Sequence, residues 1–385
     1  MKIAIYGAGK AGEYVVQQIR ESKESKLEVV WFIDNNPDYL GKSKYGVSIV
    51  NLESFMKAYR NTAEGILIAA LDEMTVQKMA VSLLNHSYGN IYILPSNVLT
   101  GTLPVLNSSG EFISYIKHIS TCKPVLPYVE YHVSDYCNLK CKRCGHFSNI
   151  VTEKVFPDME EFRAELKGLS KRFRNIRQFR LMGGEPFINP DLKSFVCEVR
   201  REFPYADIRI VSNGLLLPNV SAQTLEAIRK CGATIDISQY PPTRKIMENL
   251  IRFAQEKELK IQVGKEITQF FKGISSDVST EYEKIYSKCV SKTCHFLRKG
   301  RLYVCGAPIL FFENKDFLEL DITDEDVKNN SFDLIEGYED GWEILKKLLS
   351  PFDFCRHCTY AQWYDWQVSG ENVDKGDWIV SEAER

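Results

Sequence analysis

The chain has 385 residues, of which 44% are hydrophobic and 26% are charged, and its formal net charge is −2. This length exceeds what one ordinary core serves, so the sequence predicts two or three domains. Acidic and basic residues are interspersed, which excludes the basic footprint of a nucleic-acid-binding protein and a polybasic membrane contact.

The chain begins with a predicted strand at residues 2–6 rather than with a charged leader, and no apolar run approaches the roughly 20 residues that a membrane helix needs. We therefore expect a cytoplasmic protein with no membrane partner and no nucleic-acid partner. Eleven cysteines in such a protein favour metal or cluster ligation over disulfides, because the cytosol keeps thiols reduced.

Residues 1–100 alternate short apolar runs with helical patterns. Candidate strands lie at residues 2–6, 29–33, 66–70 and 91–93, and a helix follows the first of them from about Ala11. This alternation predicts an α/β domain with a parallel, doubly wound sheet. Over residues 101–125 the periodicity fades and Gly, Ser, Asn and Pro collect, so we expect a domain linker there.

Three glycines, Gly7, Gly9 and Gly12, lie between the first strand and its helix, and Asp34 ends the second strand. Such glycines allow close approach of a phosphate to the free N–H groups of the helix start, and an acid at Asp34 can bind ribose hydroxyls. The stretch 32–49 resembles the small Rossmann-like domains of bacterial nucleotide-sugar and polysaccharide-biosynthesis enzymes. The resemblance implies a domain that binds a nucleotide or nucleotide sugar at these four residues, or one that serves only as a scaffold.

A second series of strands is predicted at residues 129–133, 178–182, 207–211, 234–238 and 260–263. Amphipathic helices separate them, one behind the capping pattern of Asp158 and Glu161 and another behind Asn189-Pro190. The series predicts an open or partial barrel over residues 126–285. In such folds the reactive groups lie on the loops that follow the C-terminal ends of the strands.

Two motifs fall on those loops. The first is Cys137, Cys141 and Cys144, whose C-x3-C-x2-C spacing can hold a four-iron cluster and leave its fourth iron without a protein ligand. The second is the Gly-Gly-Glu-Pro stretch 183–186, where glycines let the backbone approach a cofactor closely. A structural zinc site is the alternative for the cysteines, but it would need a fourth ligand from elsewhere.

Together the motifs resemble those of the radical S-adenosylmethionine (SAM) superfamily, which has a partial (β/α)6 barrel. The resemblance implies a [4Fe-4S] cluster on the three cysteines, SAM chelated to the open iron, and a reductant such as flavodoxin or ferredoxin. Reductive cleavage of SAM then yields a 5′-deoxyadenosyl radical that abstracts hydrogen from substrate. The family often has an aromatic residue before the last cysteine, where this chain has Arg143, so Phe147, or else His146, takes the adenine contact. The cofactor contacts implied are Phe147, Gly183, Gly184, Glu185, Pro186, Ser212, Asn213 and Ser238.

A second cysteine group occupies the last hundred residues. Cys294, Cys305, Cys355 and Cys358 resemble the ligands of the twitch or SPASM-like auxiliary-cluster domain that follows the core in many radical SAM enzymes. The resemblance implies a small, irregular, cysteine-rich domain over residues 286–385 with a second [4Fe-4S] cluster. Cys289 competes with Cys294 for a place in the set, and a zinc ion is the alternative occupant. The remaining cysteines on predicted helices, Cys197 and Cys231, are expected to be buried structural thiols.

Three functions are compatible with these motifs. The first is a radical SAM enzyme that acts on a carbohydrate or nucleotide-linked sugar, which the fusion to the N-terminal domain favours. The second is a radical SAM peptide-modifying maturase. The third is a non-enzymatic iron–sulfur or zinc redox-sensing module. The expected partners are accordingly a small-molecule or peptide substrate and the reductant, and the identity of the substrate and the outcome of the radical reaction stay open.

Overall fold

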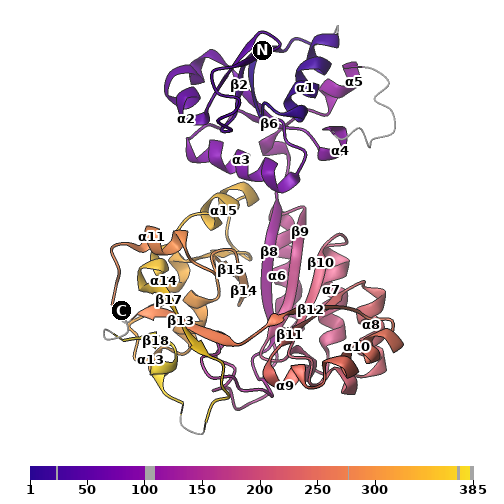
Figure 1. The fold of residues 1–385 in the computed structure, drawn as a ribbon, viewed down its shortest axis with the longest axis vertical. Coiled ribbons are helices and arrows are strands. Elements are labelled where there is room, and N and C mark those ends of the chain that lie inside the picture. The colour runs from indigo at the N-terminus through magenta and orange to yellow at the C-terminus, as the bar shows by residue number, and fades with distance from the viewer. Residues whose placement is uncertain (23–24, 100–108, 276, 371–372, 382–385) are drawn as a thin grey trace. The chain divides into compact units, whose positions relative to one another are not determined.

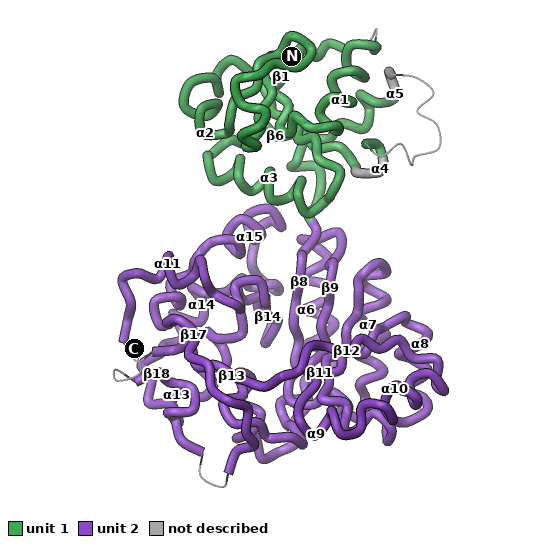
Figure 2. The backbone as a smooth tube through the Cα atoms, in the orientation of Figure 1, with its two compact units in different colours: residues 1–124 green, residues 125–385 purple. Residues whose placement is uncertain are grey.

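The computed structural model describes residues 1–22, 25–99, 109–275, 277–370 and 373–381 (Figure 1). The chain forms two compact units, Met1–Pro124 and Val125–Arg385 (Figure 2). Within the described ranges, no helix combines the length and the apolar character that a membrane crossing requires.

The first unit is built on one seven-stranded sheet. Its strands are β1 (Lys2–Tyr6), β2 (Glu28–Ile33), β3 (Ser43–Lys44), β4 (Val47–Val50), β5 (Gly65–Ile68), β6 (Ile91–Ile93) and β7 (Lys117–His118). Their order is β3-β4-β2-β1-β5-β6-β7, in which the five central strands run parallel and the two edge strands run antiparallel. The parallel sheet predicted for this part of the chain is therefore confirmed.

Helices connect these strands: α1 (Lys10–Glu21), α2 (Leu52–Ser54), α3 (Glu73–Asn85), α4 (Ser96–Leu99) and α5 (Ser109–Ser114). The apolar side of α1, with Val15 and Ile19, packs on Ile5 and Phe32 in one buried core. Phe112 of α5 is fully buried in the same core, and β7 pairs with β6. Residues 101–108 of the linker expected over 101–125 lie outside the described residues, whereas residues 109–124 are folded into this unit.

The second unit contains an eight-stranded sheet. Its strands are β8 (Val125–Ser134), β9 (Asn175–Gly183), β10 (Asp207–Ser212), β11 (Thr234–Gln239), β12 (Lys260–Glu266), β14 (Phe296–Arg298), β15 (Arg301–Tyr303) and β16 (Ser331–Asp333). Their order is β12-β11-β10-β9-β8-β14-β15-β16, and the first six of these are parallel. The predicted βα series is present, but the sixth parallel strand is β14, which joins the sheet beside β8 rather than after β12.

Five helices accompany the series: α6 (Met159–Arg172), α7 (Leu192–Glu202), α8 (Ala222–Lys230), α9 (Pro241–Arg244) and α10 (Met247–Glu256). Asp158 caps α6 by accepting the N–H groups of Glu160 and Glu161 at 2.9 Å each, as its sequence pattern suggests. Phe162 and Leu166 of α6 are buried against the sheet. Because each helix packs its apolar side on the sheet, the loops that join strands to helices are held at the edge of the sheet.

The remainder of the second unit holds a three-stranded sheet and five further helices. The strands are β13 (Gln269–Ser275), β17 (Cys358–Asp365) and β18 (Ile379–Val380), in the order β17-β13-β18. The helices are α11 (Tyr282–Ser287), α12 (Ala307–Glu313), α13 (Lys315–Leu318), α14 (Asp324–Asn329) and α15 (Gly341–Leu348). The strands β13 and β17 are antiparallel, with Phe271 opposite Trp363.

Candidate active site

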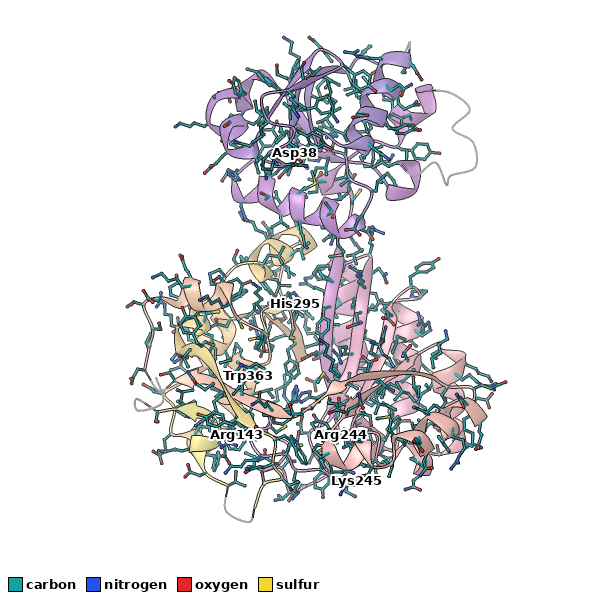
Figure 3. All side chains as sticks on the ribbon, viewed as in Figure 1. Asp38, Arg143, Arg244, Lys245, His295 and Trp363 are labelled. Carbon is teal, nitrogen blue, oxygen red and sulfur yellow. The ribbon has the colours of Figure 1, made fainter. Side chains whose placement is uncertain are left out.

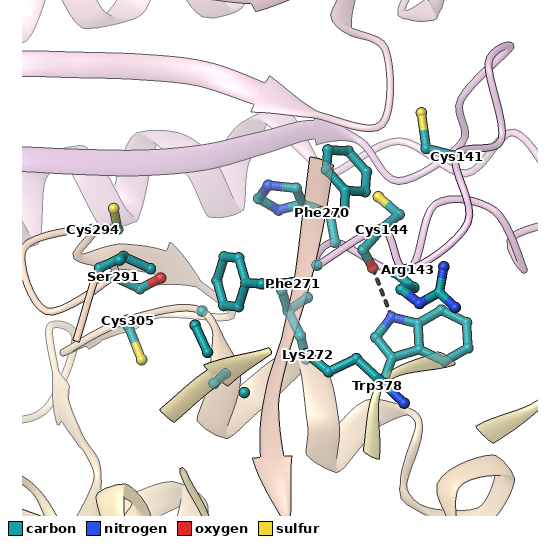
Figure 4. Close-up of a pocket in the computed structure, with 18 of the residues that line it drawn as sticks. Cys141, Arg143, Cys144, Phe270, Phe271, Lys272, Ser291, Cys294, Cys305 and Trp378 are labelled. Atoms are coloured by element: carbon teal, nitrogen blue, oxygen red, sulfur yellow. Dashed lines mark hydrogen bonds between the residues drawn. The ribbon is translucent and has the colours of Figure 1, made fainter. Parts of the chain in front are cut away.

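A cavity of about 430 Å³ lies in the second unit, where the loops after the parallel strands meet β13 and β17. Figure 4 shows Cys141 and Cys144 on one side of the view, Cys294 and Cys305 on the other, and Phe270 and Phe271 between them. The thiols that line the cavity are Cys137, Cys141, Cys144, Cys289, Cys294, Cys305 and Cys358. The fold thus brings cysteines from two distant parts of the sequence to one cavity.

The loop after β8 carries the first three cysteines on a strained backbone, since Lys140, Arg143 and Phe147 have left-handed φ angles of 48°, 61° and 57°. Burial raises the pKa of Cys137 to about 11 and that of Cys141 to about 12, and nearby thiols add to both shifts. Such thiols ionise readily only beside a cation, so this donor set fits an iron–sulfur cluster. Across the described ranges, no three His, Cys, Asp or Glu side chains converge closely enough to hold a single ion, whereas the thiolates of a cluster each bind a different iron.

Residues 367–369 and Trp378 hold this loop in place. Cys141 forms an antiparallel β-bridge with Val368, flanked by two backbone hydrogen bonds of 2.8 Å each. The indole N–H of Trp378 donates to the carbonyl oxygen of Cys144 at 2.7 Å. These contacts hold the loop in a conformation that its left-handed residues would not keep by themselves.

Gly183 and Gly184 bring the end of β9 against the loop after β8. Gly183 has a φ of +124°, and a Cβ on either glycine would lie well inside 3.0 Å of a backbone oxygen of Ser134 or Tyr136. The N–H of Gly184 donates to the carbonyl of Ser134 at 2.7 Å. Both glycines line the cavity, so the close backbone approach that the sequence suggests is present here.

Glu185 is fully buried, and its side chain is engaged in hydrogen bonds within the protein. Its carboxylate accepts hydrogen bonds from the hydroxyl of Ser212 (2.8 Å) and from the backbone N–H groups of Asn213 (2.9 Å) and Phe187 (3.1 Å). Burial raises the pKa of Glu185 to about 7. The side chain ties the loop after β9 to the loop after β10, and neither Glu185 nor Pro186 is among the lining residues. The cofactor contacts predicted at Glu185 and Pro186 stay predictions, and these hydrogen bonds give Glu185 a role in joining the two loops.

Ser212, Asn213 and Ser238, predicted from their places after the third and fourth strands, line the cavity. The side-chain amide of Asn213 donates to the side-chain oxygen of Asn138 at 2.8 Å, next to Cys137. These residues thus lie on the same wall as the cysteine triplet, as a shared cofactor site requires.

Phe147 does not reach the cavity. It is 2% exposed, stacked on Trp378 with ring centroids 4.9 Å apart, and edge-on to Phe311. His146 lines the cavity instead and shares a 2.9 Å hydrogen bond with His132. Burial lowers the pKa of His146 to about 3, so its imidazole is neutral at physiological pH. The adenine contact predicted at Phe147 stays a prediction, and in this structure its ring packs in the core.

In the second cysteine group, Cys289 contributes to the raised pKa values of Cys305, Cys355 and Cys358, whereas Cys294 contributes only to that of Cys305. Burial raises the pKa of Cys358 well above its ordinary value, and the next contributions come from Cys305, Cys355 and Cys289. Burial likewise raises the pKa of Cys294 to about 12, and there the largest contribution from a charged group comes from Glu130 of β8. Cys355 is close to these thiols without lining the cavity.

The glycine loop of the first unit is shaped by packing. Gly7 has a φ of +114°, and a Cβ at Gly7 or Gly12 would lie well inside 3.0 Å of a backbone oxygen, whereas a Cβ at Gly9 would meet nothing within 4 Å. The carboxylate of Asp34 accepts the N–H of Ala8 at 2.7 Å, so it holds the glycine turn. Only Gly9 and the helix start beside it keep the open backbone that a phosphate would need.

Several cavity residues escaped the sequence analysis. Glu130 lines the cavity from β8, where it accepts a hydrogen bond from the hydroxyl of Tyr128. Phe270 lines it from β13 and packs with Trp366 against the cysteine triplet. The adjacent aromatic residues Phe270 and Phe271 could have suggested a place in the site. Their partners on β17 could not be predicted, because that strand pairing joins segments about a hundred residues apart. Two thiols outside the cavity differ from expectation, since Cys197 is exposed and Cys231 is only partly buried.

Comparisons with known proteins agree with this site. Residues 131–255 match the family model of the radical SAM superfamily. GTP 3′,8-cyclase of Aquifex aeolicus (strain VF5) is 24% identical over 257 residues, which are 59% of this chain and 75% of that protein. Further proteins of the same name align over 28% to 54% of their own length.

Two solved structures show the range of the structural likeness. BtrN in complex with AdoMet and 2-DOIA is 15% identical, with a TM-score of 0.37, over 67% of this chain and 100% of that one. UDP-D-quinovosamine 4-dehydrogenase from Vibrio fischeri is 20% identical, with a TM-score of 0.25, over 31% of this chain and 92% of that one.

Proposed function

Because this chain is a radical SAM enzyme with its domain at residues 131–255, we propose that it takes hydrogen from a carbohydrate or nucleotide-linked sugar bound in the cavity between its two cysteine groups. The observation that carries the proposal is the shared lining of that cavity by the cysteine triplet, the glycine pair and the residues after β10 and β11. Similarity to a superfamily of enzymes favours this function over the non-enzymatic sensor. Cys137, Cys141 and Cys144 would hold a [4Fe-4S] cluster, which would supply one-electron reduction to SAM.

The chain's own residues position SAM and exclude water. Gly183 and Gly184 present backbone without side chains, so a cationic amino group can approach their carbonyls. Ser212, Asn213 and Ser238 offer polar groups to the ribose and carboxylate on the same wall. Tyr240, Phe270 and Trp366 pack against the triplet and keep the centre dry. His146, held neutral, offers its ring to the adenine.

The second cluster in this proposal is held by Cys289, Cys305, Cys355 and Cys358. We favour Cys289 over Cys294 because Cys289 contributes to the raised pKa values of Cys305, Cys355 and Cys358, whereas Cys294 contributes only to that of Cys305. Cys294 then remains a cavity thiol beside Glu130 and Tyr128. Four thiolates saturate such a cluster, so its role is electron transfer or stapling of the chain rather than SAM binding.

Counting iron in single-cysteine variants separates Cys289 from Cys294. We expect about eight irons per chain in the parent, about four in Cys289→Ala and about eight in Cys294→Ala, because only the first change removes a ligand. The measurement is iron and sulfide content after anaerobic reconstitution. A loss of four irons in Cys294→Ala with full iron in Cys289→Ala would reverse the assignment.

The first unit is proposed to be Rossmann-like and to bind the nucleotide part of the substrate. The strand order β4-β2-β1-β5-β6 and a glycine turn directly after β1 support this, since that order is the doubly wound one. The name GTP 3′,8-cyclase, given to the relatives, describes an enzyme that acts on a nucleotide. This agrees with a nucleotide-linked substrate for this chain.

The proposed substrate class is tested by the coupling of SAM cleavage to substrate. In anaerobic reactions with SAM and reductant, nucleotide sugars should increase the formation of 5′-deoxyadenosine and be altered in return, whereas short peptides should do neither. Stimulation by peptides alone would favour the maturase alternative and contradict the proposal. Background cleavage without any substrate reports whether the SAM site itself works.

A further inference from the structure

Three aromatic side chains at the cavity mouth are unusually exposed. Phe271 is 36% exposed, Tyr360 is 42% exposed and Trp363 is 53% exposed. Phe271 and Tyr360 line the cavity, and Trp363, which is labelled in Figure 3, is paired with Phe271 across the neighbouring strand. Large apolar groups gathered at a cavity mouth mark a binding surface more often than scattered surface residues do.

The pairing of β13 with β17 creates this surface. The rings of Phe271 and Trp363 have centroids 5.2 Å apart and planes tilted by 50°. The neighbours of Phe271 on β13 point to the other face: Phe270 packs edge-on to Tyr240, and Lys272 donates to the carbonyl of Gly376 at 2.8 Å. Phe270 and Lys272 also line the cavity but are engaged by these contacts, whereas Phe271, Tyr360 and Trp363 leave their rings exposed.

A cation accompanies the rings. The ammonium group of Lys288 lies 5.2 Å from the ring centroid of Tyr360 and also lines the cavity. In the part of the chain that the structure describes, Lys288 takes part in no ion pair, in contrast to Lys284 one turn earlier, which pairs with Glu281 at 2.6 Å. A lysine that lies over an aromatic ring and has no ion-pair partner among the described residues is suited to an anionic group on a ring-bearing ligand.

We propose that Phe271, Trp363, Tyr360 and Lys288, together called the aromatic shelf, bind a substrate that joins a flat ring to a phosphate. The ring stacks on the aromatic pair and the phosphate pairs with Lys288. The ring is either a nucleobase or the C–H face of a sugar, and both chemistries occur in a nucleotide-linked sugar. The inference rests on the proposed function, because it places the substrate of that same cavity.

The shelf is tested by anaerobic titration calorimetry of the full, cluster-loaded protein with SAM. The probes are UDP-glucose, UMP and methyl glucoside. Removing a stacked ring typically costs a factor of roughly 5 to 150 in affinity, so Phe271→Ala and Trp363→Ala should each weaken UDP-glucose binding about tenfold or more. Trp363→Phe should retain most of the binding because it keeps a ring. Lys288→Gln should weaken UDP-glucose and UMP but leave any methyl glucoside binding unchanged.

Tyr338→Ala is the matched control, because Tyr338 is a fully exposed aromatic residue outside this cavity. Binding of UMP as tight as that of UDP-glucose would identify the base as the stacked ring, and binding of methyl glucoside would identify the sugar. The shelf proposal is overturned if no probe binds the parent, or if Trp363→Ala and Phe271→Ala bind like Tyr338→Ala. Background formation of 5′-deoxyadenosine, followed in the same preparations, separates this failure from failure of the SAM chemistry.

Discussion

Replacing Cys141 with alanine is expected to reduce the formation of 5′-deoxyadenosine to background. Cys141 lies in the middle of the triplet, is 6% exposed and opens onto the cavity with Cys137 and Cys144. With two thiolates left, a four-iron cluster would have two irons without protein ligands, so it would be lost or would no longer present a single open iron. The measurement is chromatographic quantitation of 5′-deoxyadenosine in anaerobic reactions with SAM and reductant.

Cys197→Ala provides the control for this change. Cys197 is an exposed thiol on α7 with no place in either cysteine group, so its removal should leave cleavage unchanged. A Cys141→Ala protein that cleaves SAM at the parent rate would sink the assignment of the triplet.

Replacing Gly184 with alanine is expected to have the second large effect. A Cβ at this position would lie well inside 3.0 Å of the carbonyl of Tyr136 and 2.7 Å from that of Asp135. Both neighbours are backbone atoms of the loop that leads to Cys137, so that loop must shift. Overpacking of this kind costs about 1–3 kcal/mol of unfolding free energy, and it also displaces the wall on which SAM would lie. The measurements are the midpoint of thermal unfolding and the affinity for SAM, and both should fall.

Gly145→Ala is the matched comparison, since Gly145 lines the same cavity but a Cβ there would meet nothing within 4 Å. We expect Gly145→Ala to unfold near the parent temperature and to bind SAM with little change. Equal behaviour of the two variants would show that close backbone approach is not what position 184 requires.

Local patterns in the sequence predicted much of this site. Alternating strands and helices placed the cysteine triplet and Gly183 after successive parallel strands, and the carboxyl ends of such strands share one edge of a sheet. For the same reason Ser212 and Ser238 line the cavity together with the cysteine triplet. Periodicity within a segment carries this information, because each unit packs on its immediate neighbour.

Contacts between distant segments were not predictable in the same way. The pairing of β14 with β8 and the bridge between Cys141 and Val368 join parts of the chain that have no local pattern in common. Phe147 was assigned to the cofactor because it follows Cys144, but its ring stacks on Trp378, which lies near the other end of the sequence. The choice between Cys289 and Cys294 likewise depends on how residues 289–305 fold around the cavity rather than on spacing alone.

The central claim is that the cysteine triplet holds an iron–sulfur cluster with one iron open to SAM. Electron paramagnetic resonance of the anaerobically reduced protein tests it most directly. The account predicts a cluster signal that changes when SAM is added, with the SAM-dependent component missing in Cys141→Ala. A protein whose triplet holds zinc, or whose cluster signal is the same with and without SAM, would contradict it.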